Sequence, residues 1–267
     1  MRKKLGFALG AGGSRGVAHI GFLKAMEEAG IKPDFIAGTS MGSIIGACYA
    51  KGYSSDFMFD EIKKLSLVDL LDISFNPLMN GALLRAQKMH NKLAEYITDD
   101  FTFSQLDIPF RCVAVDLITG KPIVFKDDDK VCEAIVASST IPGVFKPVVK
   151  GDMLLVDGGL KCRLPINEVI EMGADVVVAI DVLGDLRPNY KKMNVFSLMF
   201  RTYDIMDDEI TRRKLKEQKP HLLVKPDLGD MDLFRFKDLT MAYHQGYNAG
   251  KESVGKILKL IGRKVKK

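Results

Sequence analysis

The sequence predicts an α/β fold, in which helices cover the faces of a mostly parallel β-sheet. Two observations carry this prediction. Short apolar runs alternate along the chain with longer stretches of helical spacing, and several of the runs end at a glycine-rich turn. A chain of 267 residues, 47% of them hydrophobic, can bury one substantial core, so we expect residues 1–267 to form a single domain.

The first fifty or so residues repeat a local pattern of strand, tight turn and helix. Residues 4–9 (KLGFAL) form an apolar run that glycines end, and residues 17–28 then have helical spacing. Residues 34–37 (DFIA) predict a second strand, which leads through GTSMG (38–42) into a small apolar helix over 43–50. Each turn therefore joins the end of a strand to the start of a helix.

The alternation continues to the C-terminus. Residues 54–98 have the pattern of helices around an apolar connection, and 111–117 and 122–125 predict strands that turn at Thr119-Gly120. We also expect helices over 130–138, 195–217 and 239–260, and strands over 153–156, 176–180 and 222–225.

Composition excludes several classes of protein. The four cysteines stand far apart with no Cys-x-x-Cys pair, which favours neither a metal site nor a disulfide framework and suits a reducing, cytoplasmic setting. They are Cys48, Cys112, Cys132 and Cys162. The chain has no tryptophan and no surface-like stripe of basic and aromatic residues, so we do not expect nucleic-acid binding.

The formal charge of +5 is concentrated at the C-terminus, since residues 251–267 hold seven basic residues and one acid. We expect no signal peptide and no membrane span. An apolar stripe made of Val254, Ile257, Leu258 and Ile261 would lie beside Lys256, Lys259, Arg263 and Lys264. Two interpretations are open: peripheral contact with an anionic membrane, or a helix docked on the body with a solvated basic end. The oligomeric state is open as well.

Gly38-Thr39-Ser40-Met41-Gly42 matches G-x-S-x-G at a strand-to-helix junction. Flanking Gly38 and Gly42 allow a tight turn that would leave the Ser40 hydroxyl exposed, and the following helix N-terminus favours developing negative charge. A serine that simply caps a helix would give the same local pattern.

A second glycine loop, residues 10–16 (GAGGSRG), also joins a strand to a helix, so its backbone N–H groups can bind an anion. A P-loop would need Gly-Lys-Ser/Thr, which is absent. A dinucleotide-binding loop would want an acidic residue after the second strand, where GTSMG stands instead. The oxyanion of an acyl-transfer intermediate suits the neighbouring serine turn best.

Asp157-Gly158-Gly159 ends a third strand, and strand ends are where open α/β sheets build their sites. An Asx turn would also account for Asp-Gly. The serine turn, the N–H-rich loop and the strand-end aspartate occur together, however, and this combination favours a catalytic site.

The three blocks GAGGSRGVAHIGFLKAMEEAGI, GTSMG and LLVDGG closely resemble the bacterial patatin-like phospholipases, which are related to patatin and to the catalytic domain of neuropathy target esterase. The blocks and their connections cover roughly residues 4–166, and residues 167–267 resemble the same branch less specifically. The resemblance implies a patatin-like three-layer sandwich, a lipid or acyl-ester substrate, no cofactor and no metal.

The resemblance also assigns roles to residues. Ser40 would be the nucleophile and Asp157 its base, in a dyad without histidine. The oxyanion loop would consist of Gly12, Gly13, Ser14, Arg15 and Gly16. Two positions depart from the family pattern. Ala11 stands where a glycine is common, so a positive φ there would be strained, and Cys162 stands near Asp157 where Asn or Asp is common.

Two other classes remain open. A conventional α/β-hydrolase would use Ser40, Asp157 and either His221 or His244. None of the four histidines, which include His19 and His90, lies in a loop signature. A silent regulatory protein on the same scaffold is the second alternative. If lipids are substrates, the apolar segments 73–84 (ISFNPLMNGALL) and 194–200 (NVFSLMF) could line the acyl entrance, although both could equally be core or a subunit interface.

Overall fold

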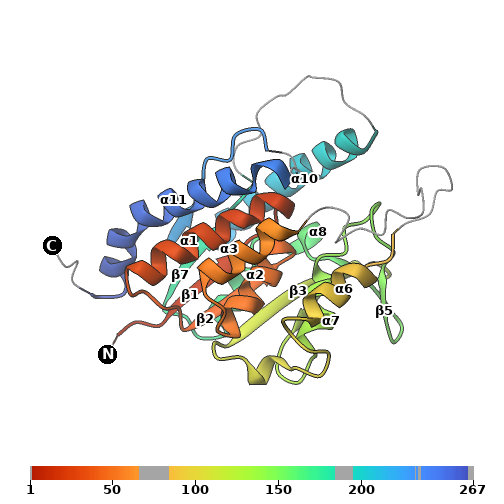
Figure 1. The fold of residues 1–267 in the computed structure, drawn as a ribbon, viewed down its shortest axis with the longest axis horizontal. Helices are drawn as coiled ribbons and strands as arrows, with labels where there is room; N and C mark the ends of the chain where they lie inside the picture. Colours follow the sequence, from red (N-terminus) through yellow and green to blue (C-terminus); the bar gives the residue numbers. More distant parts are fainter. Residues whose placement is uncertain (1, 66–83, 184–194, 232, 234–235, 264–267) are drawn as a thin grey trace.

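A single β-sheet runs through the computed structural model, which describes residues 2–65, 84–183, 195–231, 233 and 236–263 (Figure 1). Within these residues the sheet has eight strands, seven of them in the order β5-β6-β3-β2-β1-β7-β8, with β4 paired to β3 off this path. The strands are β1 (Leu5–Leu9), β2 (Phe35–Thr39), β3 (Phe110–Asp116), β4 (Pro122–Phe125), β5 (Val148–Lys150), β6 (Met153–Asp157), β7 (Val176–Ile180) and β8 (Leu222–Val224).

The sheet is parallel through its centre, as the sequence predicts. Strands β3, β2, β1, β7 and β8 run parallel to one another. On the far side of β3 the direction reverses, because β4 and β6 pair with β3 antiparallel and β5 pairs with β6 antiparallel. This antiparallel arm carries the strand that ends at Asp157.

Helices cover both faces of the sheet. The α-helices in the described residues are α1 (Val17–Glu28), α2 (Met41–Ala50), α3 (Ser55–Lys64), α6 (Gln87–Ala94), α7 (Val131–Ser138), α8 (Gly159–Cys162), α9 (Ile166–Glu171), α10 (Val195–Glu217) and α11 (Leu239–Leu260). Helix α11 lies along α1 in Figure 1. A Cβ atom on Gly246 would come within 1.9 Å of the Ala18 backbone oxygen, so a glycine is needed for this close approach.

Alternation along the strands separates two apolar layers. Leu5, Phe7 and Leu9 of β1 belong to the larger core cluster, which contains residues of α1, α2 and α11. Ala8 faces the other way and joins a second cluster that includes Val169 of α9. Because successive side chains of a strand point to opposite faces, the sheet lies between two helical layers, which confirms the expected three-layer sandwich.

The apolar stripe near the C-terminus is part of the core. Ile257, Leu258 and Ile261 are buried, and Val254 packs against them, whereas Lys256 and Lys259 are exposed. The structure therefore agrees with the interpretation in which the helix is docked on the body. Contact of its basic residues with a membrane stays a prediction.

None of the described helices is both long enough and apolar enough to cross a bilayer. The four cysteines are all free thiols, and three of them are buried.

Candidate active site

Ser40 and Asp157 approach each other beside β3. Ser40 follows β2, whose last residue Thr39 pairs with Val113, and Asp157 ends β6 opposite the next β3 residue, Ala114. Since β2 runs parallel to β3 and β6 runs antiparallel on its other side, the C-terminal ends of β2 and β6 approach each other from opposite directions across β3. Asp157 thus lies at a strand end as predicted, but it reaches the site on an antiparallel strand rather than at the shared carboxyl edge of parallel strands.

The two side chains are in direct contact. Ser40 Oγ donates a hydrogen bond of 2.6 Å to Asp157 Oδ2, and Gly159 N donates one of 2.8 Å to Asp157 Oδ1. Burial away from water raises the pKa of Asp157 to about 6, although both hydrogen bonds favour the carboxylate. A carboxyl group with this pKa is a stronger base than a solvent-exposed aspartate and is still ionised at neutral pH.

The turn that presents Ser40 has a strained backbone. Ser40 has φ of 54° and ψ of −126°, one of two positive φ values among non-glycine residues in the described chain. The conformation is fixed by Ser138 Oγ, which accepts from Ser40 N at 2.9 Å and donates to the Val113 carbonyl. A Cβ atom on Gly42 would lie 2.3 Å from the Leu9 carbonyl oxygen, so the turn cannot sit this close to β1 without that glycine.

The structure corrects one expectation about Ser40. The residue is 5% exposed, so the hydroxyl is not open to bulk solvent as a turn serine would be. Ser40 lines two pockets instead. Gly38 packs against the Gly42 backbone within the turn, where a Cβ atom would lie 2.3 Å from the Gly42 carbonyl oxygen.

The glycine loop after β1 offers free donors at two positions. Ser14 N donates to the Leu233 carbonyl and Arg15 N to the Gly12 carbonyl, so these two amides are occupied. The amides of Gly12 and Gly13 have no hydrogen-bond partner within the described residues. In the predicted oxyanion loop, which ends at Gly16, the amides of Gly12 and Gly13 are therefore the candidate oxyanion donors.

The positive φ in this loop falls at Gly13, with φ of 54°, and a Cβ atom there would lie 2.5 Å from the Leu233 backbone oxygen. Ala11 is not among the residues with positive φ, so its departure from the family pattern introduces no such strain. At the second departure, Cys162 contributes its carbonyl oxygen, which accepts a hydrogen bond from Thr39 Oγ1.

Two arginines hold the loop in place. Arg15 pairs with Asp204 of α10 through contacts of 2.8 and 3.2 Å. Arg163, with 2% of its side chain exposed, binds Asp181 and also donates to the Ala11 carbonyl at 3.1 Å. The side chain of Arg15, a residue of the predicted oxyanion loop, therefore joins the loop to the C-terminal third of the chain.

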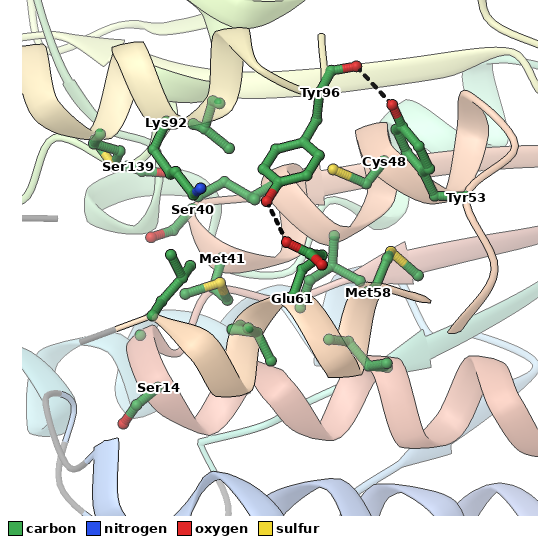
Figure 2. A pocket seen from close by; sticks show the side chains of 18 of the residues that line it. Ser14, Ser40, Met41, Cys48, Tyr53, Met58, Glu61, Lys92, Tyr96 and Ser139 are labelled. Atoms are coloured by element: carbon green, nitrogen blue, oxygen red, sulfur yellow. Dashed lines mark hydrogen bonds between the residues drawn. The ribbon is translucent and has the colours of Figure 1, made fainter. Parts of the chain in front are cut away.

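Ser40 lies where two pockets meet. The first pocket is apolar and is built mainly from α2, α3 and α6, and Figure 2 shows Ser40 and Met41 towards the left and Met58 towards the right. A hydrogen bond of 2.7 Å from the Tyr96 hydroxyl to Glu61 links the walls. The apolar lining of this first pocket consists mainly of Ile20, Met41, Ile44, Ile45, Phe57, Met58, Ile62, Leu65, Met89, Leu93, Ile141 and Phe145.

The second pocket is the more polar of the two, and we call it the polar pocket; it shares Gly13, Ser40, Ile141 and Leu233 with the first. Asp157 lines it, and its other charged side chains come from the glycine loop, from Arg163 and from α10. These are Arg15, Arg163, Asp204 and Asp207. The Ser40 hydroxyl and the Gly13 amide therefore lie between the apolar pocket and the polar pocket.

Two segments were expected to line an acyl entrance. The first, 73–84, lies outside the described residues except for Leu84, so the expectation for it stays a prediction. In the segment 194–200, Leu198 and Met199 line neither pocket, and Phe200 lines the polar one. The apolar lining comes instead from the helix that follows Ser40 and from α3 and α6, whose apolar faces resemble ordinary core positions in the sequence.

None of the four histidines, all of which are described, lines either pocket. His19 is fully buried and its Nε2 lies 2.8 Å from the Gly10 carbonyl, and burial lowers its pKa to about 4. His221 Nδ1 accepts from Val177 N, and His90 pairs with Asp99. A Ser-Asp-His arrangement with any of them is not formed.

One cluster of possible metal ligands occurs in the described chain. His90, Asp99 and Cys132 have ligand atoms within 4.8 Å of one another. The His90 Nε2 is already 3.1 Å from Asp99, whose side chain is 66% exposed, and the cluster belongs to neither Ser40 pocket. The Ser40 site itself offers no such group of ligands among the described residues.

Comparison with known proteins agrees with this geometry. The model of the patatin-like phospholipase family matches residues 7–170. An uncharacterized NTE family protein of Mycobacterium tuberculosis is 35% identical over 183 residues, which make up 68% of this chain and 49% of that protein. Lysophospholipase nte1 of Aspergillus fumigatus is 31% identical over 189 residues, 67% of this chain and 12% of the fungal protein.

Among solved structures, VipD from Legionella pneumophila has a TM-score of 0.60 at 12% identity, covering 97% of this chain and 67% of VipD, which shows a shared fold. The chain spans about half the length of the mycobacterial protein and a small part of the fungal one. Since the family model covers more than half of the chain and includes Ser40 and Asp157, the chain belongs to the patatin-like phospholipase family.

Proposed function

We propose that this protein hydrolyses acyl esters of lipids with Ser40 as nucleophile and Asp157 as its base. The observation that carries the proposal is the 2.6 Å hydrogen bond from Ser40 Oγ to a buried carboxylate, in a strained turn that opens into an apolar pocket. Family membership and the similarity to a protein named lysophospholipase support the same class of substrate.

In the first step, Ser40 Oγ attacks the ester carbonyl while its proton passes to Asp157 Oδ2. The carbonyl oxygen becomes an oxyanion, for which the unpartnered amides of Gly12 and Gly13 are the available donors. Collapse of this intermediate breaks the bond to the alcohol, which leaves with the proton from Asp157.

In the second step, water attacks the acyl-enzyme and gives its proton to Asp157. The same two amides stabilise the second oxyanion, and its collapse releases the fatty acid and returns the proton to Ser40. One carboxyl group therefore acts as base and as acid in turn, a task for which a pKa of about 6 is better suited than the usual aspartate value of about 3.9.

The acyl chain would occupy the apolar pocket. Its walls are methionine, isoleucine, leucine and phenylalanine side chains, and flexible methionines adapt to lipid tails of different shape. The alcohol would then extend into the polar pocket, since both compartments meet at Ser40.

We further propose that residues 1–267 work as a single unit. The support is that the loop next to Ser40 depends on the C-terminal third: Asp204 pairs with Arg15, and the Leu233 carbonyl accepts from Ser14 N.

Labelling with a fluorophosphonate probe tests the proposed function. Wild-type protein should gain one probe adduct, located at Ser40 by peptide mass spectrometry, and should hydrolyse p-nitrophenyl decanoate. Ser40→Ala should lose both properties, whereas Ser43→Ala, which removes a hydroxyl three residues away, should still be labelled at Ser40. Labelling of folded Ser40→Ala at the wild-type rate would contradict the proposal.

A further inference from the structure

The polar pocket beside Ser40 has an unusual charge balance for an enzyme of phospholipid-like substrates. Its lining contains two guanidinium groups, from Arg15 and Arg163, and three carboxylates, from Asp157, Asp204 and Asp207. An arginine that faces a substrate pocket would ordinarily be expected to bind a phosphate or carboxylate of the substrate.

Both arginines are already bound to carboxylates. Arg15 makes two contacts with Asp204, and its side chain is 6% exposed. Arg163 is 2% exposed and is held by Asp181 and the Ala11 carbonyl. Arg163 is also 3.9 Å from Asp207, and Asp181 pairs with Lys225 as well. The guanidinium donors of both arginines thus maintain the loop instead of facing an incoming anion.

Asp207 differs from the other carboxylates of the pocket. Its closest cation is Arg163, at 3.9 Å from Nε, and it accepts no hydrogen bond within the described residues. Its side chain is 22% exposed and lines the pocket. Burial raises its pKa to about 7, with smaller contributions from the nearby Asp157 and Asp204, so Asp207 is about half ionised at pH 7 and ionised at pH 8.

From this arrangement we propose that the polar pocket receives the alcohol part of the ester and that Asp207 is a specificity-determining residue, which favours neutral or cation-bearing alcohols over anionic ones. The inference rests on the proposed ester hydrolysis at Ser40. The physical reason is Coulombic: at pH 8, above the pKa of Asp207, an anionic group in this pocket would approach a carboxylate that accepts no hydrogen bond from a guanidinium group among the described residues, whereas a quaternary ammonium group would be attracted.

The test uses three esters with the same acyl chain and different alcohol charge: decanoylcholine, 1-decanoylglycerol and 1-decanoylglycerol 3-phosphate. For the wild type we expect kcat/KM to be at least about tenfold lower for the phosphate ester than for the other two. The ratio of kcat/KM for 1-decanoylglycerol to kcat/KM for the phosphate ester should shrink several-fold in Asp207→Asn. In Asp207→Glu, which keeps the charge, it should stay near the wild-type ratio. Thermal unfolding of each variant establishes that it is folded.

The matched control is Asp208→Asn. Asp208 is the next residue of α10, pairs with Arg212 and does not line the pocket. It should leave the ratio unchanged.

Two failures are distinguishable. If p-nitrophenyl decanoate hydrolysis is present and lost in Ser40→Ala, but Asp207→Asn leaves the ratio between esters unchanged or the wild type prefers the phosphate ester, the inference is wrong and the proposed function stands. If no Ser40-dependent hydrolysis of p-nitrophenyl decanoate is found, the proposed function fails and this inference fails with it.

Discussion

Ser40 Oγ and Asp157 Oδ2 are 2.6 Å apart although 117 positions separate the two residues in the sequence. They meet because β2 and β6 flank β3 from opposite directions and end one residue apart in its register, at Val113 and Ala114. The contact is thus built into the pairing of the sheet, and its chemistry follows from burial of the carboxylate.

The pH dependence of activity should report the pKa of Asp157. Because the base must be ionised before it can accept a proton, kcat/KM for p-nitrophenyl decanoate should rise about tenfold per pH unit below pH 6 and level off above it. In Asp207→Asn the midpoint should remain close to 6 or fall slightly, because the repulsion between the carboxylates of Asp157 and Asp207 is removed. A midpoint close to 4 would contradict the account.

Asp157→Asn should increase stability at alkaline pH. A buried carboxyl whose pKa is higher in the folded than in the unfolded state destabilises the fold as pH rises from about 4 to about 6, and a shift of this size corresponds to about 3 kcal/mol. The neutral amide removes this term. We expect a higher unfolding temperature than the wild type at pH 8 and a smaller difference at pH 4. A lower unfolding temperature at pH 8 would be the opposite result.

Two substitutions of Ser40 should differ in stability. Alanine and glycine both remove the hydroxyl, but only glycine adopts φ of 54° without strain. Strain of this kind is worth roughly 1–3 kcal/mol, so Ser40→Gly should have the larger free energy of unfolding, by about 1 kcal/mol or more. Urea denaturation of the two inactive variants provides the comparison, and equal stability would mean that the turn is not strained.

Neighbouring serines 138 and 139 should respond differently to replacement by alanine. Ser138 Oγ accepts from Ser40 N and donates to the Val113 carbonyl, so its loss leaves two buried backbone groups without partners, at a cost of about 2 kcal/mol or more. Ser139 Oγ is buried and has no partner among the described residues, so its removal should be close to neutral or stabilising. Urea denaturation midpoints of the two variants provide the comparison. An equal loss of stability in both variants would mean that Ser138 does not anchor the turn.

The long elements of the fold were predictable because each has a strong local pattern. The sequence predicts the strand over 176–180 and the helices over 195–217 and 239–260 with the bounds that the structure has. It does not reveal the three-residue β5 or the short helices α8 and α9, which are too brief for a periodicity to emerge. The antiparallel direction of β6 is a property of pairing between distant segments and leaves no local signal.

The candidate site was predictable where backbone geometry demands particular residues. The tight turns around Ser40, Gly13 and Asp157 need glycines, and these mark the motifs. The polar pocket was not predictable, since Asp204 and Asp207 belong to a helix whose sequence resembles an ordinary charged surface helix. Tertiary contacts relate that helix to Ser40, namely Arg15 with Asp204 and Arg163 with Asp207.

The most direct test of the dyad is a comparison of Asp157→Asn with single alanine substitutions of His19, His90, His221 and His244. If Asp157 takes the Ser40 proton directly, the asparagine variant should be folded and lose at least about 10²-fold in kcat, because an amide keeps the shape but not the basicity. The histidine variants should keep their activity once unfolding curves establish that they are folded, a check that matters most for the fully buried His19. A folded histidine variant with a loss as large as that of Asp157→Asn would contradict the account and indicate a triad.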